Sequence, residues 1–329
     1  MTPKLNASSR ILLEEAQKLG IDCTTFADNE TLLMEHEGKQ WYTRGSRTSF
    51  QSSVGKTIAD YKPLTKQILS HFGHPTGKWV VVSRKEGLTD QVIEQLKTLK
   101  YPVVMKPLDE RHGKGVIVGL QNIDAVTARY TAGTGVLVEE QLTGVEYRIV
   151  CVDYKFVAAA FRKPAFVVGD GSSTIQQLIE KKNAHPWRGE SHENNLTTIK
   201  VDDEMKALLQ QEKFTLDDVL PDGREAILRK TANLSTGGEA WNVSDQVHPE
   251  NKALFEAIAK SCDLNVIGID VMCEHIDQPI LTQPTAGIIE VNASPGLRMH
   301  HYPIQGEVVN VAERILQMCL RKIRHTDKK

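Results

Sequence analysis

The sequence lacks several features that would assign it to a class at once. It has five cysteines, and no two of them show the close spacing of a zinc site or a redox pair. They are Cys23, Cys151, Cys262, Cys273 and Cys319, and we expect them to be reduced and mostly buried. No apolar run approaches the roughly 20 residues of a membrane-spanning helix, and no secretory signal is evident. We therefore expect a cytoplasmic protein without a membrane partner.

An excess of charge of one sign is also missing. The chain has 40 Lys and Arg residues against 42 Asp and Glu residues, and its formal charge is −2. This balance gives no global attraction to nucleic acid, although it leaves a local basic patch open. At 329 residues, 40% of them hydrophobic, the chain can bury a core and divide into two or three lobes. We expect a globular protein without a nucleic-acid partner.

The two standard nucleotide-binding fingerprints are absent as well. The stretch "SSVGKT" ends like a P-loop, but Phe50 stands where that pattern requires its first glycine. In "GKGVIVG" the third glycine comes one residue too late for a dinucleotide motif. Neither stretch therefore identifies a nucleotide-binding fold.

A charged, glycine-containing loop is nevertheless present in "MKPLDERHGKGVIVGL", residues 105–120. It places three basic side chains among two glycines, namely Arg111, His112, Lys114, Gly113 and Gly115. Glycines allow backbone N–H groups to approach a ligand closely, and the cations add favourable charge, so this loop suits a polyphosphate. An ordinary surface hairpin with a basic tip is the alternative interpretation.

Apolar periodicity predicts helices and strands along the whole chain. Helices are expected over residues 8–19, 60–73, 87–99 and 308–323, and strands over 21–26, 78–83, 101–107, 115–120, 134–142, 264–272 and 286–292. The second helix should turn Leu64, Ile68, Leu69 and Phe72 inward. A hairpin is expected over 147–152 and 155–162, with its turn at Asp153 and Tyr154.

We predict three parts: an N-terminal α/β unit over residues 1–58, a central lobe with the glycine-rich loop over 59–141, and a C-terminal lobe over 142–329. The last part contains a polar stretch at about 169–230, which we expect to be a mobile, partly helical excursion.

The strongest chemical signal lies in "GIDVM" and "IIEVNASPG". Side chains two residues apart on a strand share a face, so Glu290 and Asn292 should project together, and antiparallel pairing would bring Asp270 beside them. Carboxylates in apolar strands are costly unless something compensates them. Two acids and an amide suit Mg²⁺ that bridges phosphate groups. A pair of hydrogen-bonded buried acids is the alternative.

These features occur in an order that resembles the ATP-grasp ligases: Lys106, the glycine-rich flap, "VEEQLTG", "GID" and "EVNASPG". Longer stretches, including "RGESHENNLTTIKVDDE" and "NLSTGGEAWNVSDQVHPEN", resemble the ATP-grasp module of cyanophycin synthetases, and then that of bifunctional glutathione synthetases. The resemblance covers about residues 45–318. It implies an α+β (α/β) ATP-grasp fold in which two lobes clasp ATP, preceded by the small N-terminal unit.

The activity that this resemblance implies is the ATP-dependent joining of a carboxylate to an amine through an acyl phosphate, with release of ADP and phosphate. The implied cofactors are ATP and two Mg²⁺ ions, with Mn²⁺ as the alternative ion. The implied substrates are amino acids or short peptides, and we expect a homodimer or a higher homo-oligomer. A glutathione-synthetase-like ligase acting on a γ-glutamyl peptide, a non-catalytic ATP-binding protein and an ATP-grasp carboxylase are the alternatives.

The resemblance also implies residue roles. The nucleotide set comprises Lys62, Lys106, His112, Gly113, Lys114, Gly115, Glu139, Glu140, Leu142 and Glu146. Within this set, Lys62 and Lys106 are expected to contact the phosphates, and the flap over 109–116 is expected to close over them. Glu139, Glu140 and Leu142 are expected to hold adenine and ribose. Glu146 is also expected to orient an arginine. The metal set is Asp270, Glu290 and Asn292.

The remaining roles concern the transferring group and the substrate. The catalytic set is Arg229, Asn233 and Arg298, and the substrate set is Arg148, Arg162, Ser294, Pro295, Gly296 and Arg298. His300 is a further candidate. Because the chain printed here ends at Lys329, we expect neither a Mur-ligase module nor a γ-glutamyl-cysteine ligase region, and a single ligation step.

Overall fold

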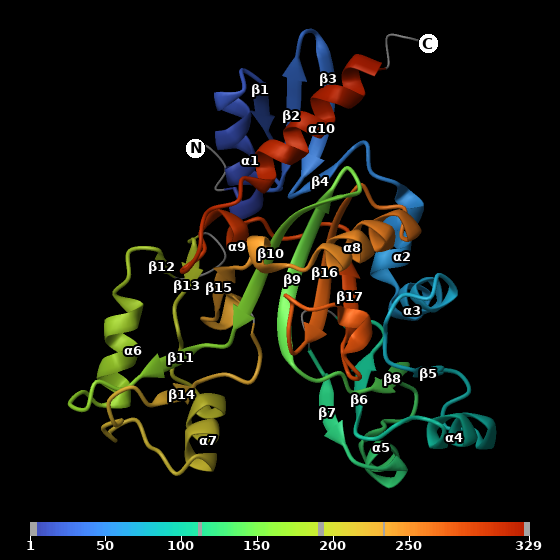
Figure 1. Cartoon of the computed structure of the whole chain (residues 1–329), viewed down its shortest axis with the longest axis vertical. Coiled ribbons are helices and arrows are strands. Elements are labelled where there is room, and N and C mark those ends of the chain that lie inside the picture. Colours follow the sequence, from blue (N-terminus) through green and yellow to red (C-terminus); the bar gives the residue numbers. More distant parts are fainter. Residues whose placement is uncertain (1–4, 111–113, 190–193, 233, 326–329) are drawn as a thin grey trace. The chain divides into compact units, whose positions relative to one another are not determined.

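The computed structural model describes residues 5–110, 114–189, 194–232 and 234–325. The chain divides into two compact units, whose helices and strands are labelled in Figure 1. Unit 1 comprises Met1–Phe50, Glu146–Asp245 and Ser294–Lys329, and unit 2 comprises Gln51–Val145 and Gln246–Ala293. These boundaries differ from the predicted breaks after residues 58 and 141, because the predicted C-terminal part contributes to both units. The three-part division stays a prediction.

The N-terminal part of unit 1 is an antiparallel sheet with two helices beside it. The sheet runs in the order β1 (Asp22–Thr25), β2 (Thr31–His36), β3 (Lys39–Arg44) and β4 (Arg47–Thr48). Helix α1 (Ala7–Lys18) begins after Asn6, whose side chain accepts the N–H of Ser9, and it buries Ile11, Leu12 and Ala16. The predicted helix and strand at the N-terminus are thus confirmed.

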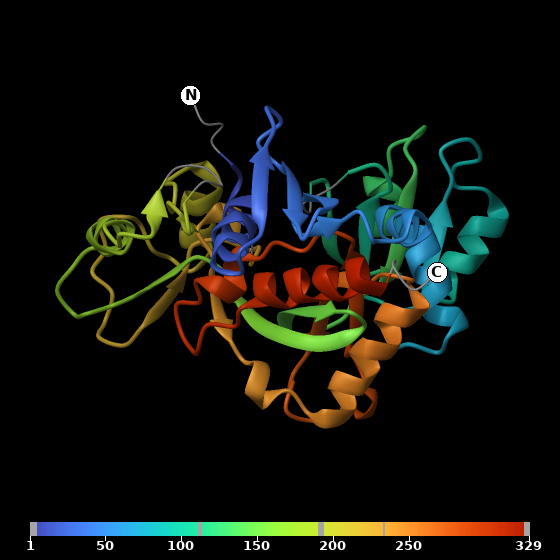
Figure 2. The ribbon, with the colours of Figure 1, turned by 90° about the horizontal axis from the view of Figure 1, so that it is seen from above.

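Helix α10 (Val311–His325) packs on α1 and on β10 of the same unit (Figure 2). Its apolar side, with Ile315, Leu316 and Cys319, is fully buried. The final helix predicted from the sequence is confirmed, although it begins at Val311. Within the described residues, no helix is both long enough and apolar enough to cross a membrane.

Unit 1 contributes three antiparallel strands to a second sheet, namely β9 (Val145–Val152), β10 (Lys155–Lys163) and β15 (Glu239–Asn242). The predicted turn between β9 and β10 is confirmed at Asp153 and Tyr154, whose φ angles are 54° and 60°. The short helix α9 (Arg298–His301) packs on this sheet through Met299, which contacts Ala160 and Ala240 in one buried cluster. The sheet and α9 carry most of the predicted substrate arginines.

The excursion at 169–230 is more ordered in its packing than its polar composition predicts. Its regular elements are α6 (Ile175–Asn183), β12 (Arg188–Gly189), β13 (Leu196–Thr197), α7 (Asp203–Gln211) and β14 (Glu225–Ile227), and β14 pairs with β11 (Phe166–Val168), the strand just before the excursion. The short helices confirm the partly helical prediction. Ile175, Ile179, Met205 and Leu209 are buried in a core of its own, which the prediction missed because few apolar residues are spread over a long polar stretch.

Unit 2 begins with α2 (Ser53–Asp60) and α3 (Lys62–His71), followed by a four-stranded antiparallel sheet in the order β5-β8-β6-β7. Its strands are β5 (Trp79–Val82), β6 (Val103–Pro107), β7 (Ile117–Leu120) and β8 (Val136–Glu140), with α4 (Asp90–Lys97) and α5 (Ile123–Arg129) between them in sequence. These strands and α4 confirm the predicted ones. Their apolar side chains form one buried cluster around Val103 and Val138.

The inward face of α3 differs from the prediction at one position. Phe72 is 55% exposed, whereas Lys66 is only 2% exposed. The helix ends at His71, so Phe72 is its C-cap and no longer follows the helical face. The expectation that Phe72 lies inward is therefore wrong, and a lysine occupies the buried face instead.

The remainder of unit 2 consists of α8 (Pro249–Ser261), β16 (Val266–Cys273) and β17 (Gly287–Asn292). Short 3₁₀ helices occur at Leu234–Thr236 in unit 1, at Ser244–Gln246 where the two units meet in sequence, and at Ile280–Thr282 in unit 2. β16 and β17 pair antiparallel, as the sequence predicts. Ile267, Ile269 and Val271 of β16 are fully buried. The polar residues of these two strands therefore lie among buried apolar side chains.

Candidate functional site

The acidic face of β16 and β17 is the first part of the candidate site. Asp270 lies directly opposite Glu290, and Gly268 lies opposite Asn292. The three polar side chains therefore share one face. Asp270 is 3% exposed, and Nδ2 of Asn292 donates to Oε1 of Glu290 at 3.3 Å. The expected juxtaposition is present in unit 2.

This face fits a magnesium site by the chemistry of its donors. Two carboxylates and an amide supply hard oxygen ligands, and burial in an apolar strand favours a compensating cation. Among the described residues, no group of three or more His, Cys, Asp and Glu side chains could hold a metal ion; this face instead combines two carboxylates with one amide. The role of Asp270, Glu290 and Asn292 as metal ligands stays a prediction.

A buried group of two lysines and one glutamate is the second part, also in unit 2. Glu139 of β8 is 4% exposed, and its Oε2 atom lies 2.6 Å from Nζ of Lys66. Its Oε1 atom contacts Nζ of Lys106 on the neighbouring strand β6. The sequence analysis placed Lys106 at the ATP phosphates and Glu139 at adenine and ribose. The structure places both side chains in one ion-paired group, and their nucleotide contacts stay predictions.

Opposing effects set the pKa values in this group. Burial alone would raise the pKa of Glu139, but Lys66 and Lys106 outweigh burial, and the pKa is lowered. Burial lowers the pKa of Lys66, and the attraction of Glu139 only partly opposes this. We take Glu139 as ionised at neutral pH, because two ammonium groups contact its carboxylate.

Lys62 contacts the segment that leads into the predicted flap. Its Nζ atom donates to the carbonyl oxygens of Pro107 and Glu110 at 3.2 and 2.6 Å. Gly115 has a φ of 70°, and a Cβ atom added there would lie 2.9 Å from Pro107, so this turn favours glycine. Of the other flap candidates, Lys114 is exposed, whereas His112 and Gly113 lie outside the described residues.

Glu140 and Leu142 lie at the end of β8. The carboxylate of Glu140 accepts the backbone N–H of Lys100 at 2.9 Å. Leu142 lies close to Gly287, where an added Cβ atom would be 3.3 Å from its side chain. Glu140 therefore supports the backbone at Lys100, and the predicted contacts of Glu140 and Leu142 with adenine and ribose remain untested.

Two of the predicted substrate arginines, Arg148 and Arg162, share one face of the unit 1 strands. Arg148 lies opposite Ala160 in the β9–β10 register, and Arg162, two residues along β10, therefore shares its face. Glu146 forms an ion pair with Nη1 of Arg162 at 2.7 Å, so it contacts one of the arginines that it was expected to orient. Met299 packs on Ala160, which brings α9 onto this same face.

Helix α9 adds a further buried cation and a buried imidazole. Nη1 of Arg298 donates to the carbonyl of Asn194 at 2.7 Å, and burial together with the Arg10 charge lowers its pKa. His300 is 1% exposed, and neither ring nitrogen has a hydrogen-bond partner among the described residues. Burial, aided by the charges of Arg148 and His301, lowers its pKa to about 3, so His300 is neutral at pH 7.

The loop of Ser294, Pro295 and Gly296 precedes α9. Ser46 donates its hydroxyl to the carbonyl of Pro295 at 2.7 Å, and its Oγ atom lies 3.4 Å from that of Ser294. The N-terminal part of unit 1 therefore fixes the conformation of this loop. Its predicted contact with a substrate carboxylate stays a prediction.

Arg229 already has a carboxylate partner. Its Nη1 and Nη2 atoms each donate to one oxygen of Asp202 at 2.6 Å, and Nη2 also donates to the carbonyl of Lys200 at 2.8 Å. The hydrogen bonds from Arg229 help to lower the pKa of Asp202 to about 2. Arg229 thus joins two segments of the excursion, and its predicted phosphoryl contact remains untested. Asn233 lies outside the described residues.

Sequence analysis missed Lys66. A signal for it existed, since Lys62 and Lys66 lie four residues apart and therefore on one side of α3. Its apolar neighbours on that helix, however, offered no reason to choose the lysine as a buried residue. Only the position of Glu139 in the fold identifies its partner.

Comparison with known proteins agrees with this architecture. No family model matches the chain. The fold is that of the ATP-grasp ligases: a crystal structure of a bifunctional glutathione synthetase from Pasteurella multocida matches with a TM-score of 0.78 and 26% identity over 97% of this chain and 44% of the other.

Within this class, the chain is similar to part of two larger enzymes. It is 34% identical to the cyanophycin synthetase of Geminocystis herdmanii over 95% of this chain and 36% of that protein. It is 30% identical to a glutathione biosynthesis bifunctional protein of Streptococcus mutans over 97% of this chain and 43% of that protein. The chain thus spans well under half the length of these relatives.

Proposed function

We propose that the protein is an ATP-dependent carboxylate–amine ligase that forms an amide bond between amino acids or short peptides. The observation that carries this proposal is the presence, in one compact unit, of the Asp270, Glu290 and Asn292 face and of the ion-paired Lys66, Glu139 and Lys106 group. The first suits Mg²⁺ and the second supplies cationic charge for phosphates. The similarity to two kinds of ligase supports the same reaction class.

The chemistry follows from the poor leaving ability of hydroxide. A carboxylate oxygen attacks the γ-phosphorus of ATP, the bond to the ADP oxygen breaks, and an acyl phosphate forms. The amine then attacks the acyl carbon, phosphate leaves, and the nitrogen loses a proton. Mg²⁺ ions held by the acidic face, with two ions proposed and Mn²⁺ as a substitute, would neutralise the phosphate oxygens. The protein's own contribution is to orient the reactants and to balance charge.

The unit 1 arginines support an acidic substrate. Arg148, Arg162 and Arg298 are cationic side chains of unit 1, and Glu146 forms an ion pair with Arg162. Planar guanidinium groups match carboxylates in shape and hydrogen-bond pattern. We therefore propose that these arginines bind the carboxylates of an amino acid or an acidic peptide. A ligase acting on a γ-glutamyl peptide is the second candidate, and the structural match to a glutathione synthetase favours it.

The test is a measurement of ADP release with ATP and Mg²⁺ over a panel of amino acids, γ-glutamyl peptides and short acidic peptides. Mass spectrometry then identifies the amide product. Release of ADP that requires both an acid and an amine supports the ligase. Nucleotide binding without ADP release across the panel favours a non-catalytic ATP-binding protein, and bicarbonate-dependent turnover favours a carboxylase. Sedimentation of the same preparation tests the predicted homo-oligomer.

A further inference from the structure

Lys66 is a buried lysine whose contacts among the described residues lie within unit 2. It is 2% exposed, and its Nζ atom lies 2.6 Å from Oγ1 of Thr76 and 3.1 Å from the carbonyl oxygen of Ile288. The remaining contact is Oε2 of Glu139, at 2.6 Å. Three oxygen atoms thus surround an ammonium group that has three N–H donors, and the position of Lys66 is fixed.

Lys106 differs from Lys66 in the use of its donors. Within the part of the chain that the structure describes, its ammonium group contacts the Glu139 carboxylate, and its side chain is 14% exposed. An ammonium group has three donors, so the structure leaves Lys106 with capacity for a ligand. A phosphate contact of Lys106, which the family resemblance implies, stays a prediction.

The balance of charge depends on Lys66. With both lysines protonated and Glu139 ionised, the three side chains carry a net charge of +1. If Lys66 were absent, Glu139 would neutralise Lys106 and the net charge would be zero. An anionic ligand would then have to compete with Glu139 for the Lys106 ammonium group.

Lys66 also connects the two candidate parts of unit 2. The carbonyl that it contacts belongs to Ile288 on β17, the strand that carries Glu290. Thr76 donates to the same carbonyl at 3.2 Å. Through Glu139, Lys66 reaches the sheet that contains Lys106. It therefore sets the position of the cationic group relative to the acidic face.

We propose that Lys66 is a positioning residue for nucleotide polyphosphate: it occupies one oxygen of Glu139 and so leaves the charge of Lys106 available to the phosphates. This role rests on the proposed function, since it concerns the same nucleotide. Lys66 donates hydrogen bonds to Thr76 and to the carbonyl of Ile288 and forms an ion pair with Glu139. The affinity for a nucleoside diphosphate or triphosphate should depend on Lys66, whereas the affinity for a nucleoside without phosphates should not.

The test compares binding of ADP and of adenosine, measured by calorimetry on the full chain. Lys66→Met is expected to weaken ADP binding about tenfold and to change adenosine binding less than about twofold. The double variant Lys66→Met/Glu139→Gln has the net charge of the unaltered group, so its ADP affinity is expected to return to within about threefold of the original. Lys97→Met, which removes an exposed lysine of unit 2, is the matched control and should change neither.

If Lys66→Met is unstable, Lys66→Arg provides a second test because it keeps the positive charge at this position. This variant should retain most of the ADP affinity. Equal losses for ADP and adenosine, or a double variant weaker than Lys66→Met, would overturn the proposed role of Lys66 and leave the proposed ligase intact. Failure of the unaltered protein to bind ADP at all would instead overturn the proposed function.

Discussion

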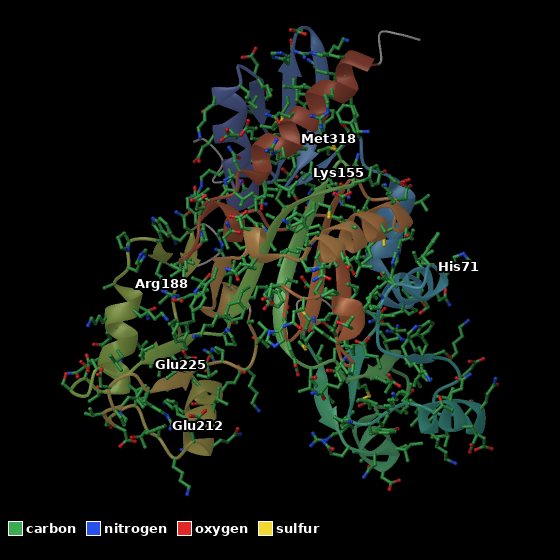
Figure 3. All side chains as sticks on the ribbon, viewed as in Figure 1. His71, Lys155, Arg188, Glu212, Glu225 and Met318 are labelled. Atoms are coloured by element: carbon green, nitrogen blue, oxygen red, sulfur yellow. The ribbon has the colours of Figure 1, made fainter. Side chains whose placement is uncertain are left out.

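Both units contain a buried glutamate that contacts two cationic side chains. The two groups differ in how many N–H donors of these cations are already bound to protein oxygen atoms. In unit 2, Glu139 contacts Lys66 and Lys106. In unit 1, Oε1 of Glu239 contacts Lys182 and Arg188, each at 2.8 Å. Arg188 is labelled within the excursion in Figure 3. The same pattern of charges therefore occurs twice in one chain.

The unit 1 group is closed by further contacts. Arg188 also donates to the carbonyls of Thr197 and Gly237 at 2.7 and 3.0 Å. Lys182 donates to the carbonyl of Phe166 at 2.8 Å and lies 3.4 Å from the centre of its ring. These cations tie segments of the excursion to β15, whereas Lys106 has donors to spare. An ion pair with a buried glutamate therefore does not by itself identify a ligand-binding cation. The useful distinction is whether the cation has N–H donors that are not already bound to the protein.

The largest effect is expected at the acidic face of unit 2. Glu290→Gln keeps the shape of the side chain and removes a metal-binding charge, so ADP formation should fall at least about 100-fold. Circular dichroism should show a folded protein. Asp277→Asn, at a position that is 65% exposed in its side chain, is the matched control. Near-normal turnover of Glu290→Gln would show that Glu290 holds no catalytic metal.

The next largest effect concerns the closed group of unit 1. Glu239→Gln leaves Arg188, whose side chain is 1% exposed, without a carboxylate, and the free energy of unfolding should fall by about 3 kcal/mol. Glu225→Gln removes the partially exposed partner of Lys163 and should cost less than about 1 kcal/mol. Urea unfolding measures both. ADP affinity should be unchanged in each variant, and a loss of affinity in Glu239→Gln would end the distinction between the two groups.

The sequence predicted the elements that depend on local patterns. Alternation along the strands gave the shared face of Glu290 and Asn292, and two apolar strands with a connection between them gave the pairing with Asp270. The order of the motifs carried the resemblance to the ATP-grasp ligases, which predicted the fold. These predictions needed only neighbouring residues or a recognisable motif.

The sequence could not predict features that depend on distant segments. The burial of Lys66 follows from Glu139, Thr76 and a β17 carbonyl, and no local pattern links these positions. The core of the excursion escaped notice for the same reason, because Ile175 and Met205 meet only after the polar stretch has folded. The bidentate partner of Arg229 likewise comes from a separate segment.

A smaller effect, on the pH dependence of stability, is expected at His300. Its pKa is about 3 in the folded protein and about 6.5 when unfolded. The unfolded chain therefore binds a proton first as the pH falls, so stability is fully present above about pH 6.5 and is lost as the pH falls from there toward 3. Between pH 7 and 5 this amounts to about 2 kcal/mol.

The variant His300→Gln removes this titration, so the fall in unfolding free energy between pH 7 and pH 5 should be about 2 kcal/mol smaller than in the unaltered protein. Urea unfolding at both pH values gives the comparison. His275→Gln, at a side chain that is 57% exposed, should leave the pH dependence unchanged. An identical pH dependence in His300→Gln would mean that the imidazole is solvated or paired in solution.

The smallest effect separates substrate binding in unit 1 from nucleotide binding in unit 2. Arg298→Ala removes a buried cation that we propose binds the substrate carboxylate, so the KM for the acidic substrate should rise about tenfold, while the KM for ATP stays within about twofold. Arg224→Ala, at a side chain that is 53% exposed, should change neither. Because Arg298 also donates to the carbonyl of Asn194, Arg298→Lys separates charge from this contact. If Arg298 is purely structural, its replacement should lower kcat and raise both KM values together. If Arg298 binds the substrate, its replacement should raise the KM for the acidic substrate alone.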